Sequence, residues 1–188
     1  EMGVDISSLG ETMALMREVA SGSGSRTFEL GYGGAESNVL TQASRLGLRT
    51  RWVSSLGSDA FGQLISAGLG AEGVELIGLE PEGRQTGLMV KTYGASADPT
   101  VVYYRANSAA SHLQLGPAQI DAVLAAKFLH ITGIFPALSG VTRRTLSSLL
   151  SEAEKRGVRV SFDVNYRPRL WARDEAADAL GDHWKSAS

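Results

Sequence analysis

The chain has 188 residues, a formal net charge of −2 at pH 7 and no cysteine. Its length allows one domain with a sizeable core, and its 43% hydrophobic and 20% charged residues are typical of a soluble globular protein. The charge offers no basic surface for nucleic acid, the lack of cysteine excludes disulfides and thiolate metal sites, and no apolar run is long enough to span a bilayer. We therefore expect no nucleic-acid partner, no membrane partner and a cytoplasmic location.

Strands and helices alternate along the first half of the chain. The pattern predicts a strand over residues 4–16, a strand over 27–32, a helix over 35–46, a strand over 50–56 and a helix over 61–71. The apolar residues expected to form the buried face of the helix over 35–46 are Val39, Leu40, Ala43 and Leu46. Gly47 is suited to end that helix in the left-handed conformation, and Asp59 is suited to cap the next helix.

The second half continues this alternation after an interruption. The expected elements are extended runs over 85–93 and 100–106 with a turn-rich segment between them, a helix over 117–127, a strand over 128–132, a helix over 139–156, a strand over 158–164 and a helix beginning near Arg173. Strand–helix–strand units of this length imply parallel pairing with right-handed crossovers. The sequence therefore predicts an α/β fold with a doubly wound, mainly parallel sheet.

Three segments do not fit that rhythm. Residues 27–31, 85–93 and 100–106 alternate with period two, which is typical of strands with one buried and one exposed face. We expect them to form a small separate β-sheet beside the main one.

The stretch "GYGG" before the helix over 35–46 allows two interpretations. It begins like the dinucleotide-binding pattern G-x-G-x-x-G at Gly31, but Glu36 occupies the third glycine position and would repel a pyrophosphate. One remaining interpretation is a tight strand-to-helix turn in which Glu36 is favoured by the helix dipole. The other is that the glycines let a polyhydroxylated ligand approach the backbone, while Asn38 hydrogen-bonds its hydroxyl groups.

Polar side chains at two further places also indicate ligand binding. On the run over 100–106, Tyr103 and Arg105 share one face, which suggests a lid over a polar ligand; a single arginine snorkelling from a sheet is the alternative. Asp163, Asn165 and Arg167 follow one another at spacing two at the carboxyl end of a predicted parallel strand, where open α/β sheets bind ligands. Polar residues in a buried strand would be costly without partners, which favours a functional interpretation here.

No metal-binding pattern is evident in the sequence. His130 lies in a predicted strand and is interpreted as a satisfied core histidine. The chain contains no His-x-x-x-His, Glu-x-x-His or paired-carboxylate arrangement. We therefore expect no protein-held metal.

Four stretches together resemble a known family. "GYGGAESNVLTQASRLGLRTRWVSSLGSDAFG" is similar to the amino-terminal signature of the ribokinase/PfkB carbohydrate kinases, and "TGLMVKTY", "VVYYRANSAAS" and "FDVNYRPRLW" resemble the 2-keto-3-deoxygluconate kinase branch. The resemblance covers residues 10–171. It implies a ribokinase-like fold with a small β-sheet lid, ATP and Mg²⁺ as cofactors, and phosphorylation of 2-keto-3-deoxygluconate or a related sugar acid.

The resemblance also implies roles for individual residues. The residues expected to contact the sugar acid are Gly33, Gly34, Asn38, Tyr103, Arg105, Ile134 and Arg167. Asn165 and Arg167 are expected to lie between the substrate and the nucleotide phosphates. Met89 stands where this branch often has a tyrosine on the first lid strand. The lid sheet of this family often packs on a second copy, so a homo-oligomer is expected.

The family's catalytic aspartate is missing from this sequence. It occurs in a Gly-Ala-Gly-Asp turn that opens a helix, and it takes the proton from the attacking hydroxyl. The Gly-Asp pair in "LGDHW", residues 180–184, lacks that context. We therefore expect residues 1–188 to be part of a ribokinase-like domain, with the catalytic base and most of the ATP site in an absent C-terminal part, and to be inactive alone. The alternative is a finished, non-catalytic module for sugar-acid binding or dimerisation.

Overall fold

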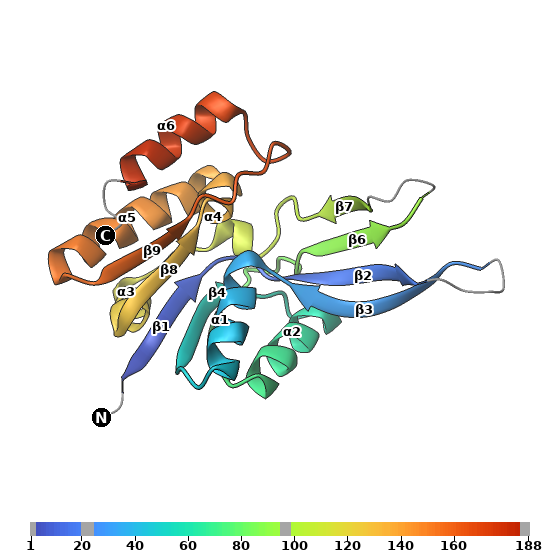
Figure 1. Ribbon diagram of the computed structural model, residues 1–188, viewed down its shortest axis with the longest axis horizontal. Coiled ribbons are helices and arrows are strands. Elements are labelled where there is room, and N and C mark those ends of the chain that lie inside the picture. Colours follow the sequence, from blue (N-terminus) through green and yellow to red (C-terminus); the bar gives the residue numbers. More distant parts are fainter. Residues whose placement is uncertain (1–2, 20–24, 95–98, 185–188) are drawn as a thin grey trace.

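The computed structural model describes residues 3–19, 25–94 and 99–184, and these form two β-sheets with helices packed around the larger one (Figure 1). In this part of the chain the main sheet has the strand order β5-β4-β1-β8-β9, and all of its strand pairs are parallel. Its strands are β1 (Val4–Leu9), β4 (Thr50–Ser55), β5 (Val74–Leu79), β8 (Ala126–Thr132) and β9 (Arg159–Asp163).

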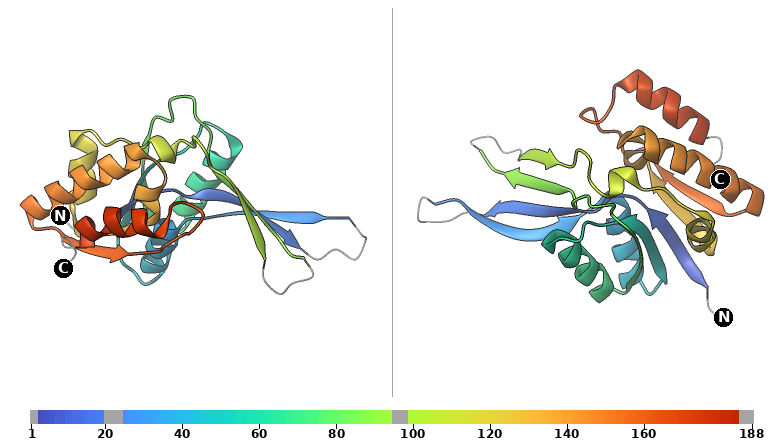
Figure 2. Two further views of the ribbon diagram at one scale, coloured as in Figure 1. Left: turned by 90° about the horizontal axis from the view of Figure 1, so that it is seen from above. Right: turned by 180° about the vertical axis from the view of Figure 1, so that it is seen from behind.

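The second sheet has the strand order β3-β2-β6-β7. Its strands are β2 (Met13–Val19), β3 (Thr27–Gly33), β6 (Leu88–Thr92) and β7 (Thr100–Tyr104). Strands β2 and β6 pair in parallel, and each carries an antiparallel neighbour on its other side. Both views of Figure 2 show these blue and green strands extending beyond the helices.

Helices cover both faces of the main sheet, as expected for a doubly wound fold. They are α1 (Ala35–Arg45), α2 (Ala60–Ala71), α3 (Pro117–Leu124), α4 (Ile134–Ala137), α5 (Gly140–Arg156) and α6 (Arg173–Trp184), with a 3₁₀ turn η1 (Ala110–His112). On one face, α1 and α2 pack around the buried Trp52 side chain. On the other face, α3 and α5 pack against alternate residues of the strands, including Leu129 and Ile131. The two faces thus have separate apolar cores, and the predicted α/β fold is confirmed.

Local capping signals in the sequence are also present in the structure. Asp59 caps α2 by accepting a hydrogen bond from the Gly62 backbone N–H at 2.8 Å. Gly47 follows α1 with φ +87°, which is the left-handed conformation that glycine adopts at little cost. Ser139 caps α5 in a reciprocal arrangement with Thr142.

Several expected boundaries were wrong. The run over residues 4–16 is not one strand: it breaks at Gly10–Thr12 into β1 and β2, which belong to different sheets. The sequence also missed β5 and α4, and it extended the helix over 117–127 into β8, which begins at Ala126. On α1, Leu40 and Ala43 are buried as expected, but Val39 is exposed, because Glu36 and Ser37 complete the buried face. Leu46, the residue after the helix, is also exposed. The predicted turn-rich segment 94–99 includes residues 95–98, which lie outside the described residues.

Candidate functional site

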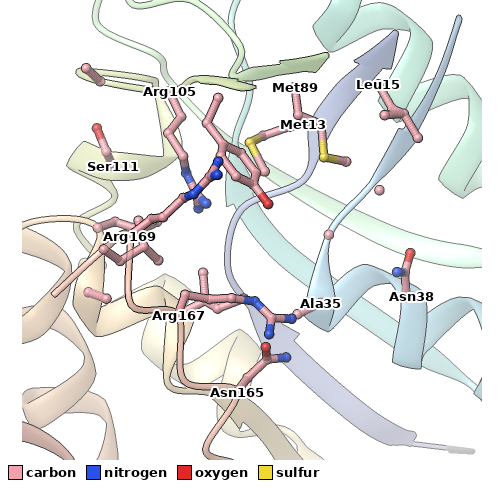
Figure 3. A pocket seen from close by; sticks show the side chains of 18 of the residues that line it. Met13, Leu15, Ala35, Asn38, Met89, Arg105, Ser111, Asn165, Arg167 and Arg169 are labelled. Atoms are coloured by element: carbon pink, nitrogen blue, oxygen red, sulfur yellow. The ribbon is translucent and has the colours of Figure 1, made fainter. Parts of the chain in front are cut away.

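A cavity of about 1040 Å³ lies where the second sheet, the start of α1 and the loop after β9 come together (Figure 3). The residues that sequence reasoning had selected for a site and that line this cavity are Gly33, Gly34, Asn38, Tyr103, Arg105, Ile134, Asn165 and Arg167. They come from four separate segments of the chain, residues 33–38, 103–105, 134 and 165–167. The tertiary fold therefore brings together residues that are up to 134 positions apart, from Gly33 to Arg167.

One face of the second sheet forms an apolar wall of the cavity. Leu15 on β2 is paired with Met89 on β6, and Met89 is paired with Tyr103 on β7, so these three side chains share one face. All three line the cavity. Met89, which stands at a position where a tyrosine had been considered, thus offers a thioether and no hydroxyl group on this wall.

On the α1 side of the cavity, packing within the chain explains Gly34 without any ligand contact. A Cβ atom at Gly34 would collide with the backbone carbonyl oxygen of Glu11, whereas one at Gly33 would meet Met89 at an ordinary 3.4 Å. Gly34 is therefore required by the chain's own packing. Asn38, one turn into α1, is exposed and lines the cavity.

Three arginines supply the charge of the cavity. Arg105, Arg167 and Arg169 line it, and none of the described residues that line it is an aspartate or a glutamate. Figure 3 shows Arg105 and Arg169 on one side of the space and Asn38 on the other, with the Arg167 side chain directed toward Ala35. Sequence reasoning missed Arg169, which also donates a hydrogen bond of 2.6 Å to the Val101 carbonyl on β7. The cavity therefore presents an electropositive wall beside an apolar one.

Asn165 occupies the loop after β9 and not the strand itself. Its backbone has φ +37°, a left-handed conformation that asparagine tolerates better than most residues. Asp163 holds it there by accepting hydrogen bonds from its backbone N–H at 3.0 Å and its side-chain amide at 3.1 Å. The expectation of buried strand positions was wrong: Asp163 and Arg167 are exposed, because β9 ends at Asp163. The Asn165 side-chain oxygen is buried without a hydrogen-bond partner in the described part of the chain.

A buried glutamate lies beneath the α1 end of the cavity. Glu36 is only 1% exposed, and the hydroxyl of Thr132 at the end of β8 donates a 2.5 Å hydrogen bond to its carboxylate. Gly10 leaves the space that this carboxylate fills, since a Cβ there would collide with it. Burial raises the pKa of Glu36 to about 7, although the Thr132 hydrogen bond and the charge of Arg105 act in the opposite direction. In the sequence, Glu36 was interpreted as a first-turn residue favoured by the helix dipole, so its burial was not predicted.

A second buried glutamate, Glu11, contacts the cavity wall directly. Its carboxylate forms an ion pair with Arg105 and accepts a hydrogen bond from the Ser108 hydroxyl. Burial raises the pKa of Glu11, while Arg105 and Ser108 lower it. Sequence reasoning missed this residue; the only signal was that "GET" interrupts two apolar strand segments.

The described residues include no group of three histidine, aspartate or glutamate side chains that could hold a metal ion. His130 is buried, as expected, and its Nδ1 lies 3.1 Å from the Ser161 hydroxyl. Its Nε2 has no partner among the described residues, so the histidine is only half satisfied. Burial lowers its pKa, against the opposing charge of Asp163. In the same part of the chain, none of the helices is both long enough and apolar enough to cross a membrane.

The Gly-Asp pair of "LGDHW" lies within α6, which continues to Trp184. It therefore does not form a turn that opens a helix.

Comparison with known proteins gives consistent results. The sequence matches the model of the pfkB family of carbohydrate kinases over residues 5–185. It is 38% identical over 174 residues to the 2-dehydro-3-deoxygluconokinase of Bacillus subtilis (strain 168), which covers 90% of this chain and 54% of that protein. The chain spans about half the length of the curated relatives it matches.

Solved structures show the same fold. The 2-dehydro-3-deoxygluconokinase of Thermotoga maritima superposes with a TM-score of 0.87 and 28% identity, covering 99% of this chain and 58% of that one. An uncharacterized sugar kinase from Pyrococcus horikoshii, solved in complex with ATP, superposes with a TM-score of 0.82 and 27% identity, covering 97% of this chain and 61% of that one.

Proposed function

The chain belongs to the pfkB family of carbohydrate kinases, and on this basis we propose that the whole protein phosphorylates a sugar acid, 2-keto-3-deoxygluconate or a close relative, with ATP. The observation that carries the sugar-acid part is the charge of the cavity, whose charged lining residues in the described part are all arginines. A guanidinium can give a carboxylate two parallel charge-assisted hydrogen bonds, and a neutral sugar cannot accept them in the same way.

We assign the cavity residues by their chemistry. The amide of Asn38 offers a donor and an acceptor to sugar hydroxyl groups, and the backbone at Gly33 and Gly34 forms the adjoining wall. Tyr103 and Ile134 supply apolar surface for the carbon skeleton, and the Tyr103 hydroxyl can also hydrogen-bond the sugar.

The phosphate side of the reaction is assigned to the loop after β9. The guanidinium of Arg167 and the amide of Asn165 lie on the same wall and suit the phosphates of ATP. Magnesium would carry charge on those phosphates, but no carboxylate of the described residues lines the cavity, so we assign no protein ligand to it.

The same lack of a lining carboxylate bears on proton transfer. Without an aspartate or glutamate in the described cavity, nothing there can accept the proton of the attacking sugar hydroxyl. We propose that the base is an aspartate outside these 188 residues. Purified residues 1–188 should then bind the sugar acid without ATP-dependent turnover. The alternative, a non-catalytic module that binds sugar acids, makes the same prediction. Turnover above background would contradict both.

We further propose that the second sheet mediates self-association. Leu30, Met16, Val90 and Val102 are successive cross-strand partners and form an apolar row on the face turned away from the cavity. Leu30 is 55% exposed and Val102 44% exposed. Sedimentation velocity of the whole protein should show a dimer or larger species, and Val102→Asp should shift it to monomer. A wild-type protein that stays monomeric at high concentration would contradict this.

The central proposal is tested by comparing two ligands in the same variants. Arg105→Ala should weaken binding of 2-keto-3-deoxygluconate by about 1.5–3 kcal/mol, the strength of hydrogen bonds to a charged group, and should change the affinity for a neutral ketose much less. Arg144→Ala, which removes an exposed arginine on α5, serves as the matched control. Equal losses for the acid and the neutral sugar, measured by calorimetry, would leave only a general carbohydrate kinase.

A further inference from the structure

Glu11 lies in the buried connection between the two sheets. Residues 10–12 join the end of β1 in the main sheet to the start of β2 in the second sheet. Glu11 is 3% exposed, and Leu9 and Met13 on either side are also buried. A carboxylate in such a place is costly unless its charge is compensated, so its partners are informative.

Those partners belong to one turn at the end of β7. Arg105 pairs with one carboxylate oxygen of Glu11, and the Ser108 hydroxyl donates to the other. The same two residues close the turn, because the Ser108 backbone N–H donates to the Arg105 carbonyl at 3.1 Å. Glu11 therefore holds both ends of the turn that carries Arg105.

On the side opposite this turn, a glycine leaves room for the Glu11 carboxylate. A Cβ at Gly87, just before β6, would lie 2.9 Å from the Glu11 Oε1 atom, closer than real contacts allow. The Glu11 side chain is thus confined between β6 and the turn after β7. It has little freedom to follow Arg105 if that side chain moves.

This confinement fixes how Arg105 faces the cavity. The Arg105 side chain lines the cavity but is only 13% exposed, and its Nε has no partner among the described residues. The guanidinium therefore has one side engaged by Glu11 and at least one buried donor that no described residue uses. Figure 3 shows the Arg105 side chain directed into the cavity from the second sheet.

We propose that Glu11 is a positioning residue for ligand binding: by pairing with Arg105 across the junction of the two sheets, it orients the remaining guanidinium donors toward the carboxylate of the bound sugar acid. The identity of the ligand rests on the proposed function, whereas the effect of Glu11 on Arg105 does not. Glu11 does not touch the ligand in this scheme. A pre-oriented arginine loses less conformational freedom when it binds an anion, which improves affinity.

Two other roles for Glu11 make different predictions. If it only stabilised the fold, its removal would lower stability and leave ligand affinity unchanged. If it only reduced the positive charge of the cavity, its removal would make an anionic sugar bind more tightly. Positioning alone predicts weaker binding.

The test uses Glu11→Gln in the whole protein, with calorimetry of 2-keto-3-deoxygluconate. We expect the dissociation constant to rise about tenfold or more, in line with the cost of misplacing a binding group by about 1 Å. Arg105→Lys should also weaken binding. The double variant should bind no more weakly than the weaker of the two single variants, because both substitutions disrupt the same Glu11–Arg105 pair. Unchanged or tighter binding by Glu11→Gln would overturn the proposal.

Glu36→Gln is the matched control, since it also neutralises a buried glutamate near the cavity. Its carboxylate bonds to Thr132 and not to Arg105. At pH 6 Glu36 is largely protonated, because its pKa is raised to about 7 by burial, so the substitution changes little charge. Its dissociation constant at pH 6 should stay within about twofold of the wild type.

A second readout works without any sugar. Phenylglyoxal modifies accessible guanidinium groups, and mass spectrometry locates the modified arginine. Arg105 should react several-fold faster in Glu11→Gln than in the wild type, while the exposed Arg167 should react equally in both proteins. If the wild type fails to bind the sugar acid, the proposed function is wrong, but the modification assay still tests the role of Glu11. An unchanged rate of Arg105 modification in Glu11→Gln would overturn the positioning role.

Discussion

Glu36→Gln should remove a large pH dependence of the protein's stability. Glu36 is fully buried at the start of α1, and the Thr132 hydroxyl is the described donor to its carboxylate. The charged groups that act on it are Arg105, which favours its ionised form, and Glu11, which disfavours it. Burial outweighs the Thr132 hydrogen bond and the charge of Arg105, and it raises the pKa of Glu36 from 4.5 to about 7.

The sign follows from which state binds the proton more tightly. Because the folded state has the higher pKa, folding is favoured when Glu36 is protonated, and this stability is lost as pH rises from the unfolded pKa through the folded one. A pKa of about 7 against 4.5 corresponds to about 3 kcal/mol in total. Most of that loss falls between pH 5 and pH 8. Glutamine resembles the protonated glutamate and stays neutral throughout.

The assay is urea unfolding at pH 5 and pH 8, followed by the fluorescence of tryptophan, including Trp52, which is buried in the core beneath α1. Between these two pH values, the free energy of unfolding of Glu36→Gln should gain about 2–3 kcal/mol relative to the wild type. Other titrating groups, such as His130, are common to both proteins and cancel in the difference. Glu154→Gln, at an exposed position on α5, should show no such trend.

A constant difference between the two proteins at both pH values would refute this reasoning. It would mean that the Glu36 carboxylate is as well solvated in the folded protein as in the unfolded chain, and that the described burial does not hold in solution.

Four other substitutions, one of them a control, test local packing and helix capping. Gly34→Ala should cost about 1–3 kcal/mol of unfolding free energy, because its methyl group collides with the carbonyl of Glu11, whereas Gly70→Ala, in open space on α2, should be neutral or stabilising by up to about 1 kcal/mol. Asp59→Ala removes the cap of α2 and should cost about 0.5–2 kcal/mol. Phe135→Ala empties a fully buried position at α4 and should cost about 3–5 kcal/mol; each value is measured by urea unfolding, and a loss below about 0.5 kcal/mol for Phe135→Ala would contradict its place in the core.

Local signals in the sequence were sufficient for much of the fold. The N-terminal cap Asp59 and the left-handed Gly47 depend on residues within a few positions, so they could be recognised from the sequence. Period-two alternation likewise identified β3, β6 and β7 as strands apart from the main sheet. Patterns of glycine and polar residues selected most of the candidate site residues, and a resemblance to known motifs then suggested a role for each. These roles in ligand binding stay predictions.

The errors occurred where neighbours in the sequence gave too little information. The short strand β5 has a partly polar pattern, "VELIGL", and lies at the edge of the sheet, so its periodicity is weak. The break between β1 and β2 was missed because apolar residues continue on both sides of Gly10–Thr12, and only the tertiary fold sends them to different sheets.

By itself the sequence determined most of the helices and strands, the cap at Asp59, the helix stop at Gly47 and the period-two strands of the second sheet, because these depend on residues a few positions apart. The tertiary structure alone decided the environment of the two glutamates. Glu36 meets Thr132 96 positions further along the chain, and Glu11 meets Ser108 97 positions away. Burial and charge pairing at such separations arise only when the sheets and helices pack together, and they turn two ordinary acidic residues into a buried proton-binding group and a counter-charge for the cavity arginine.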